Sequence, residues 1–226
     1  MKTLRSITLP LTLLLLAACS GTGEVEFNEE DSIGDRLYRV TNADVGLAYI
    51  DPNADFAQYD KVMLDDLDSS KTAIVQPNSS SGAAGNRPFE LTESDQQALA
   101  QAYREVFEKE LAETGDYEIV SEAGPGVLRI AAALTEMAPS APKDDNKSRP
   151  AGRSRIYTAD GAGSMTISFA FGDSQSGEVL AIVKDSRAGN PTGGLNNAVT
   201  NMRDVRLIFA RWARMLRARL DIAHGY

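Results

Sequence analysis

The sequence predicts an α+β domain in which two amphipathic helices pack on one face of a mainly antiparallel sheet. Three observations lead to this prediction. Apolar residues recur at helical spacing in two segments, residues 92–114 and 200–223. Short apolar runs of strand length lie before and between these segments, and turn-forming residues separate the runs. Two such runs flank the turn-rich residues 172–177, a pattern typical of a β-hairpin and therefore of antiparallel pairing.

Two short strands are predicted before the first helix. Residues 48–52 (AYIDP) begin the folded body, residues 61–64 form an apolar run of strand length, and residues 71–76 add a second strand. The composition then changes at residues 77–88, which read PNSSSGAAGNRP. We interpret this segment as a surface loop, because its residue types favour turns and bring little apolar surface to a core.

The first helix is predicted to begin at Thr92, whose hydroxyl can cap a helix N-terminus. Asp95, three positions on, approximates a capping box. Gly115 is predicted to end the helix. The residues predicted to form its buried face are Leu99, Tyr103, Val106, Phe107 and Leu111.

Residues 117–120 and 127–137 are predicted to be strands, with a Gly-Pro-Gly turn between them. Residues 139–162 follow, and this long polar segment carries five basic side chains. A segment of more than about 15 residues without periodicity is usually disordered or functional, and the sequence leaves both alternatives open. The hairpin strands at residues 164–171 and 178–184 come next. Trp212 is predicted to anchor the last helix in the core.

The first residues of the chain have the pattern of an export signal. Lys2 and Arg5 precede an apolar stretch at residues 7–16, and small residues follow it. This stretch is shorter than the roughly 20 residues that a membrane-spanning helix needs. Residues 1–18 are therefore predicted to be a signal peptide.

The end of this signal, Leu16-Ala17-Ala18-Cys19, resembles the lipobox of bacterial lipoproteins. The resemblance implies that the signal is cleaved between Ala18 and Cys19, and that Cys19 carries a diacylglycerol and further fatty acyl chains such as palmitate. These chains act as a membrane anchor, since each buried methylene contributes about 0.8 kcal/mol. Ser20, which stands where Asp would retain the protein, implies an outer-membrane location facing the periplasm if the source is Gram-negative. The inner membrane is the alternative.

The domain organisation is predicted from composition. Residues 19–44 are expected to comprise the lipidated cysteine and a flexible acidic tether, because residues 20–35 contain six acids and no base. Residues 45–226 are expected to form a single α+β domain.

Composition also excludes several classes of function. The chain has 23 Lys and Arg residues against 32 Asp and Glu residues, a net charge of −9, which disfavours a nucleic-acid partner. One cysteine and one histidine exclude a disulfide scaffold and a Cys/His zinc site. Asp65, Asp66 and Asp68 lack the spacing of a calcium loop. No metal and no cofactor is therefore expected.

One set of residues suggests a serine hydrolase as an alternative. Residues 171–174 (FGDS) look like the first block of the GDSL-type hydrolases, and residues 194–196 superficially resemble their oxyanion-hole block. Asp221 and His224 have the spacing of their base pair, so Ser174 would be the nucleophile, His224 the base and Asp221 its orienting partner. Only about 50 residues separate the serine from the histidine, and Ser174 stands where a hairpin must turn. We therefore predict no catalytic residue.

The last helix carries six arginines in an otherwise acidic chain. Arg203, Arg206, Arg214 and Arg217 are the candidate face for an anionic partner, such as lipid headgroups or an acidic protein. The alternative is local: arginines favour the negative end of a helix, cover apolar surface with their stems and pair with nearby carboxylates.

Together with Cys19, four segments resemble the bacterial lipoprotein family grouped as "domain of unknown function 3313": residues 48–52 (AYIDP), 59–62 (YDKV), 176–180 (SGEVL) and 209–213 (FARWA). That family has no established activity, so the resemblance implies no catalytic residues. The predicted function is that of a membrane-anchored periplasmic lipoprotein, a non-enzymatic binding or scaffolding module of the cell envelope. Its expected partners are the membrane, through the lipid on Cys19, and an envelope protein. The alternatives are the hydrolase that uses Ser174 and a carrier of a lipid or another small ligand.

Overall fold

A computed structural model describes residues 25–76, 88–140, 157–158, 163–189, 194–195 and 198–226. In this part of the chain the strands are β1 (Phe27–Ile33), β2 (Leu37–Val40), β3 (Leu47–Ile50), β4 (Lys61–Leu64), β5 (Ala73–Ile74), β6 (Glu118–Ile119), β7 (Val127–Pro139), β8 (Tyr157–Thr158), β9 (Gly163–Asp173), β10 (Val179–Ala188) and β11 (Gly194–Leu195). The helices are α1 (Glu93–Glu108) and α2 (Ala198–His224), with a 3₁₀ turn at Phe56–Gln58 and a π-helical turn at Lys109–Glu113.

Nine of these strands form one sheet, in the order β1-β2-β3-β10-β9-β7-β4-β6, with β5 paired to β7. The predicted hairpin is confirmed: β9 and β10 pair antiparallel from Gly172 and Val179 to Ser164 and Ala188. The sheet is mostly antiparallel, but β4 pairs parallel with β6 and with β7, and β5 pairs parallel with β7. The chain passes through α1 between β4 and β6, the kind of helical crossover that a parallel pair requires.

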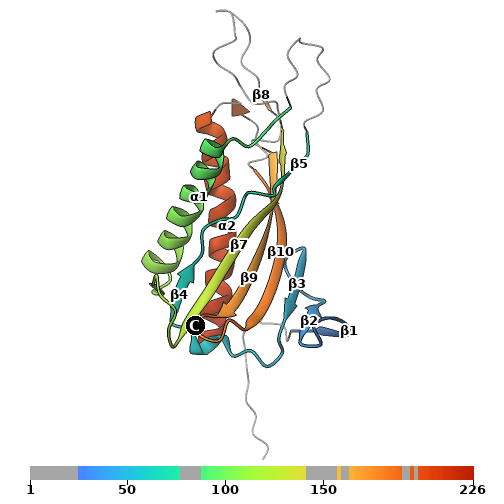
Figure 1. Cartoon of the computed structure of the whole chain (residues 1–226), viewed down its shortest axis with the longest axis vertical. Coiled ribbons are helices and arrows are strands. Elements are labelled where there is room, and N and C mark those ends of the chain that lie inside the picture. The colour runs from blue at the N-terminus through green and yellow to red at the C-terminus, as the bar shows by residue number, and fades with distance from the viewer. Residues whose placement is uncertain (1–24, 77–87, 141–156, 159–162, 190–193, 196–197) are drawn as a thin grey trace, which may run out of the picture.

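Aromatic side chains join both helices to the sheet. The ring of Phe169 on β9 lies 5.8 Å from that of Phe107 on α1 and 6.4 Å from that of Trp212 on α2, between centroids. Tyr103 of α1 meets Phe209 of α2 edge-on at 5.8 Å. Trp212 is 1% exposed, so its predicted role as the core anchor is confirmed. Figure 1 shows α2, in red, behind β7 and β9, with α1 beside it.

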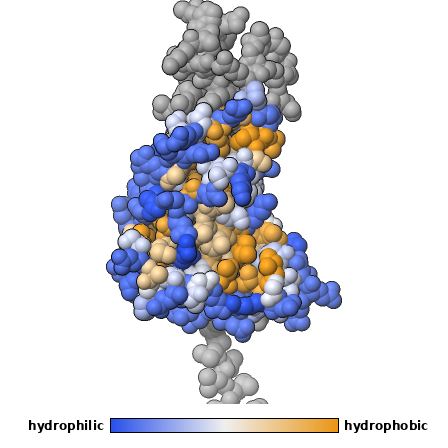
Figure 2. Space-filling view, viewed as in Figure 1, coloured by the Kyte–Doolittle hydropathy of each residue, from blue (hydrophilic) through white to orange (hydrophobic). Residues whose placement is uncertain are grey.

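In Figure 1, no helix of the described part of the chain lies in front of β7, β9 and β10. Strand register places Tyr49, Ile182, Ala170 and Ala131 in one row across the sheet, and each is half-buried. Figure 2 views this side, where hydrophobic residues gather over the middle of the sheet.

Both predicted helices are confirmed, with small changes at their ends. Thr92 caps α1: its hydroxyl accepts a hydrogen bond from the backbone N–H of Asp95, whose carboxylate accepts one from the N–H of Thr92. The π-helical turn then extends the helical segment to Glu113. Most of the two long polar loops, residues 77–87, 141–156 and 159–162, lies outside the described residues.

The predicted flexible tether is wrong for residues 27–40, which form the antiparallel pair β1 and β2 at the edge of the sheet. Acidic composition does not exclude a strand here, because an edge strand is held mainly by backbone hydrogen bonds to its neighbour and buries few side chains. Its acidic side chains face solvent or pair with bases, as Asp31 does with Arg39 at 3.2 Å. Arg36 holds the pair on the sheet through an ion pair to Asp51 of 2.7 Å.

Candidate functional site

Ser174 joins two turns through hydrogen bonds to the backbone of Gly124. Its hydroxyl donates to the carbonyl of Gly124 (3.2 Å) and accepts from the N–H of the same residue (3.1 Å). Its own N–H donates to the carbonyl of Val127 over 3.2 Å. Both hydrogen-bonding capacities of the hydroxyl are therefore engaged by backbone.

Asp221 and His224 have partners other than each other. The hydroxyl of Tyr117 donates to Asp221 Oδ1 over 2.9 Å, and Nδ1 of His224 lies 2.8 Å from the carbonyl oxygen of Leu220. Burial, and then the bond to Asp221, raise the pKa of Tyr117. Within the described residues, no hydrogen bond joins the side chains of Ser174 and His224 or those of His224 and Asp221. Gly194 and Leu195 form β11, paired with β8, and Asn196 lies outside the described residues.

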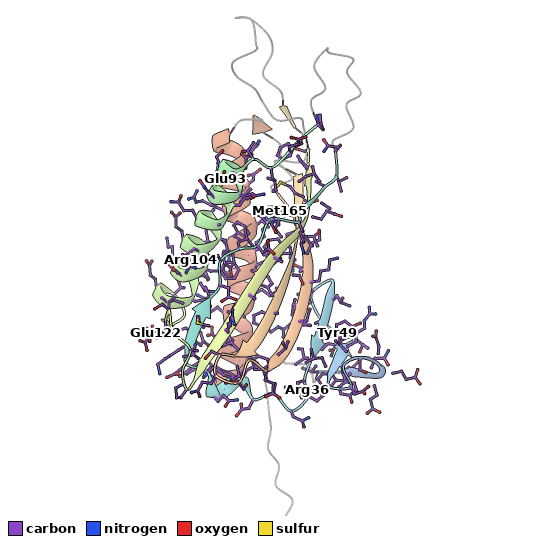
Figure 3. All side chains as sticks on the ribbon, viewed as in Figure 1. Arg36, Tyr49, Glu93, Arg104, Glu122 and Met165 are labelled. Carbon is purple, nitrogen blue, oxygen red and sulfur yellow. The ribbon has the colours of Figure 1, made fainter. Side chains whose placement is uncertain are left out.

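The three acids after β4 have separate partners. Asp65 pairs with Arg129 (2.9 Å between Oδ2 and Nη2), and Asp66 pairs at 2.7 Å with Arg104 of α1, which is labelled in Figure 3. Asp68 accepts from the hydroxyl of Ser70 at 2.7 Å. Among the described residues, no group of three or more His, Cys, Asp or Glu side chains is arranged to hold a metal ion.

A buried carboxylate on β10, Asp185, joins three elements, and it is not among the residues predicted from the sequence. Oδ2 of Asp185 accepts from the indole Nε1 of Trp212 (2.9 Å) and from Nε of Arg187 (2.6 Å). Oδ1 accepts from the N–H of Gly46 over 3.1 Å. The sequence feature that could have indicated this cluster is an acidic residue within an apolar strand, because a buried charge requires partners of this kind.

A second carboxylate cluster fixes the edge of the sheet. Arg36, labelled in Figure 3, lies between Asp51 at the end of β3 and Glu178 before β10. The hydrogen bond from Arg36 holds the pKa of Asp51 below its usual value. Nearby, the hydroxyl of Tyr49 donates to Asp31 over 2.8 Å and, with Arg39, lowers the pKa of that acid. These groups hold the fold together.

The structure separates the four arginines of the candidate anionic-partner face. Arg206 pairs with Glu105 of α1 at 2.6 Å, and Arg217 pairs with Glu110 at 3.1 Å. Both are directed toward the acids of the first helical segment. Arg219, which was not in the predicted set, pairs with Asp44 at 2.5 Å.

Arg203, Arg211 and Arg214 are exposed and form no ion pair with any residue that the structure describes. Arg211 donates only to the carbonyl of Ala188 (2.9 Å), and Arg214 only to that of Ala210 in its own helix (3.1 Å). Exposed residues recur along the same side of α2 at three- and four-residue spacing. This outer face of α2 consists of Arg203, Leu207, Arg211, Arg214, Ala218 and Ile222.

The outer face of α2 is the candidate functional site. It is cationic in an acidic chain, and its two largest apolar side chains, Leu207 and Ile222, are 37% and 42% exposed. Cys19 and Ala18 lie outside the described residues. Of the helices in the described part of the chain, none is both long enough and apolar enough to span a membrane.

Several solved structures are similar to this chain in shape. A protein of Xanthomonas campestris from family DUF330 is 11% identical, with a TM-score of 0.37 over 72% of this chain and 84% of that one. PelC of Paraburkholderia phytofirmans, solved as a dodecamer, is 11% identical, with a TM-score of 0.36 over 75% of this chain and 94% of that one. A protein of Caulobacter crescentus CB15, described as a candidate lipoprotein, is 12% identical, with a TM-score of 0.33 over 57% of this chain and 85% of that one.

No curated protein matches the sequence. The family resemblance found in the sequence is confirmed by a family model that matches residues 33–216. The chain belongs to the family described as "Protein of unknown function (DUF3313)".

Proposed function

We propose that this protein is a lipoprotein of the bacterial cell envelope, held on a membrane by lipid on Cys19, and that it acts there as a non-enzymatic binding or scaffolding module. The observation that carries the proposal is the N-terminal sequence, in which a basic start, a short apolar stretch and Leu16-Ala17-Ala18-Cys19 follow in order. In this proposal the signal is cut between Ala18 and Cys19. Ser20 favours the outer membrane, with the folded body in the periplasm.

The site geometry supports a non-enzymatic role. Ser174, Asp221 and His224 each form a hydrogen bond that holds a turn or a helix end in place. Asp65 and Asp66 pair with separate arginines, and Asp68 accepts from Ser70. A nucleophile needs a base within hydrogen-bond reach, and the contacts of Ser174 are to backbone.

The outer face of α2 supports a role in binding. An arginine that is neither paired with a carboxylate nor buried keeps its charge available to a partner. Three such arginines, Arg203, Arg211 and Arg214, stand on one side of a single helix. Because the chain as a whole has more acids than bases, this cationic face is a favourable place for an anionic partner.

Metabolic labelling tests the anchor. Cells that express the protein are grown with an alkyne analogue of palmitate, and the protein is recovered from the membrane fraction. We expect label on the native chain, no label on Cys19→Ala, and full label on the matched variant Ser20→Ala. An unlabelled native chain, or label that persists in Cys19→Ala, would contradict the proposal.

A further inference from the structure

The chain between the lipid and the fold is short. Six peptide steps connect Cys19 to Val25, the first described residue, and β1 begins at Phe27. At no more than about 3.6 Å per residue, the six steps reach at most roughly 22 Å. A lipid on Cys19 therefore keeps the folded body close to the bilayer.

The point where this segment enters the fold lies near α2. The N–H of Glu26 donates to the side chain of Asn42 (3.1 Å), and the N–H of Thr41 donates to the carbonyl of Glu26 (2.9 Å). Two residues after Asn42, Asp44 forms its ion pair with Arg219 of α2 at 2.5 Å. The N-terminal end of the described chain and the C-terminal half of α2 are thus on neighbouring parts of the molecule.

Charge distinguishes the surfaces that could face the bilayer. The β1 strand exposes Glu29 and Glu30, which form no ion pair with any described residue, and the turn after it exposes Asp35. An anionic surface repels these side chains. The outer face of α2 has the opposite charge, through Arg203, Arg211 and Arg214.

We propose that the outer face of α2 docks on the anionic phospholipid bilayer to which Cys19 is attached, so that α2 lies along the membrane surface. The inference rests on the proposed lipid anchor and adds to it the orientation of the body. From Arg203 to Ile222 the face is about 28 Å long, at 1.5 Å per residue. Its arginines contact phosphates, and the exposed side chains of Leu207 and Ile222 meet the apolar edge of the headgroup layer.

The size of the effect can be stated in advance. An arginine near an anionic membrane surface shifts a binding equilibrium about five-fold, so three arginines favour this orientation by roughly 100-fold. Salt weakens the preference, because screening acts over about 10 Å at 0.1 M ionic strength.

The test uses the acylated full chain on lipid vesicles. Ala218, which is exposed on this face between Arg214 and Ile222, is changed in an Ala218→Cys variant and labelled with a fluorophore, since acylation blocks the thiol of Cys19. Vesicles are made of phosphatidylcholine with or without phosphatidylglycerol, and both carry a headgroup quencher. We expect quenching only with phosphatidylglycerol, and we expect added salt to relieve it.

The decisive variant combines Arg203→Gln, Arg211→Gln and Arg214→Gln. Its matched control combines Lys71→Gln, Lys109→Gln and Lys184→Gln, which removes the same charge from exposed positions outside α2. We expect the arginine variant to lower the ratio of docked to undocked chains roughly 100-fold, and the lysine variant to keep most of it.

Equal quenching in both kinds of vesicle, or equal loss in the two triple variants, would overturn the proposal. Self-association that depends on the three arginines and not on the lipid would assign the face to a second copy of the chain and would overturn it as well. If the acylated preparation does not float with pure phosphatidylcholine vesicles, the lipid anchor itself is refuted, and the proposed function falls with the inference.

Discussion

Trp212 of α2 donates a hydrogen bond from its indole Nε1 to Asp185 Oδ2 of β10 across 2.9 Å in the protein interior. Arg187 reaches the same oxygen at 2.6 Å from the partly exposed end of the strand. The N–H of Gly46, just before β3, occupies the other oxygen. One carboxylate therefore joins the last helix, the hairpin and the edge of the sheet.

Replacing this carboxylate tests how much the junction stabilises the fold. In Asp185→Asn one of the two oxygens becomes an NH₂ group, which cannot accept from Gly46 or from the Trp212 and Arg187 pair. We expect the free energy of unfolding to fall by about 1–3 kcal/mol, measured by urea denaturation. The neighbouring exposed change Lys184→Gln should stay within about 0.5 kcal/mol of the native protein. Equal stability of the two variants would show that the carboxylate does not hold the junction.

Gly163 and Gly177 both have positive φ, and replacing each with alanine distinguishes the cost of steric crowding from the cost of the backbone conformation. A Cβ on Gly163 (φ +108) would lie 2.0 Å from the carbonyl oxygen of Ala138, whereas a Cβ on Gly177 (φ +72) would meet nothing within 4 Å. We expect Gly177→Ala to cost about 1–2 kcal/mol, the conformational term alone. Gly163→Ala should cost at least about 3 kcal/mol, because β7 and β9 must also move apart. Thermal unfolding of both variants measures the difference, and similar melting temperatures would be inconsistent with the close approach of these strands.

Acid sensitivity is expected from the edge cluster. The hydrogen bond from Arg36 lowers the pKa of Asp51 below its usual value of 3.8. A carboxyl with a depressed folded-state pKa contributes stability that is fully present above the unfolded value and is lost as pH falls through the folded value. Unfolding free energy should therefore be level as pH falls toward 4 and decline below it, and Asp51→Asn should reduce that decline. A decline of the same size in Asp51→Asn would remove Asp51 as its source.

Ser174 is expected to affect stability and not catalysis. Ser174→Ala removes the hydrogen bonds to Gly124 and should lower the free energy of unfolding by about 1 kcal/mol. The native protein should hydrolyse a nitrophenyl ester no faster than this variant, and a fluorophosphonate probe should leave Ser174 unlabelled. Labelling of Ser174 in the folded protein would revive the hydrolase alternative.

The N-cap of α1 offers a further check on the fold. Thr92→Ala removes the hydroxyl that accepts from Asp95, and we expect a loss of about 0.5–2 kcal/mol in unfolding free energy. Thr92→Ser keeps the capping oxygen and should retain most of the stability. If serine and alanine are equally destabilising, the capping box does not stabilise the helix.

Local patterns allowed much of this fold to be predicted. The capping pair Thr92 and Asp95, the apolar stripe through Phe107 and the turn between β9 and β10 each involve residues close in sequence, so short-range rules apply to them. The parallel pairing of β4 with β7 depends on residues about 65 positions apart and leaves no such pattern.

The candidate site was predicted in part. The excess of arginine in α2 is visible in the sequence, but the choice of which arginines remain free is made by the acids of a distant helical segment, Glu105 and Glu110. The β1 and β2 strands were not predicted, because their acidic residues are typical of a flexible tether. Only the structure shows that Arg36 and Arg39 form ion pairs with Asp51 and Asp31 at this edge of the sheet.

The central claim is that Cys19 carries lipid. Mass spectrometry of the N-terminal peptide, taken from the protein in native membranes, tests it most directly. We predict a chain that begins at Cys19 with a diacylglyceryl group on the sulfur and an acyl group on the amine. An unmodified Cys19 thiol, or a mature chain that begins elsewhere, would contradict the lipid anchor.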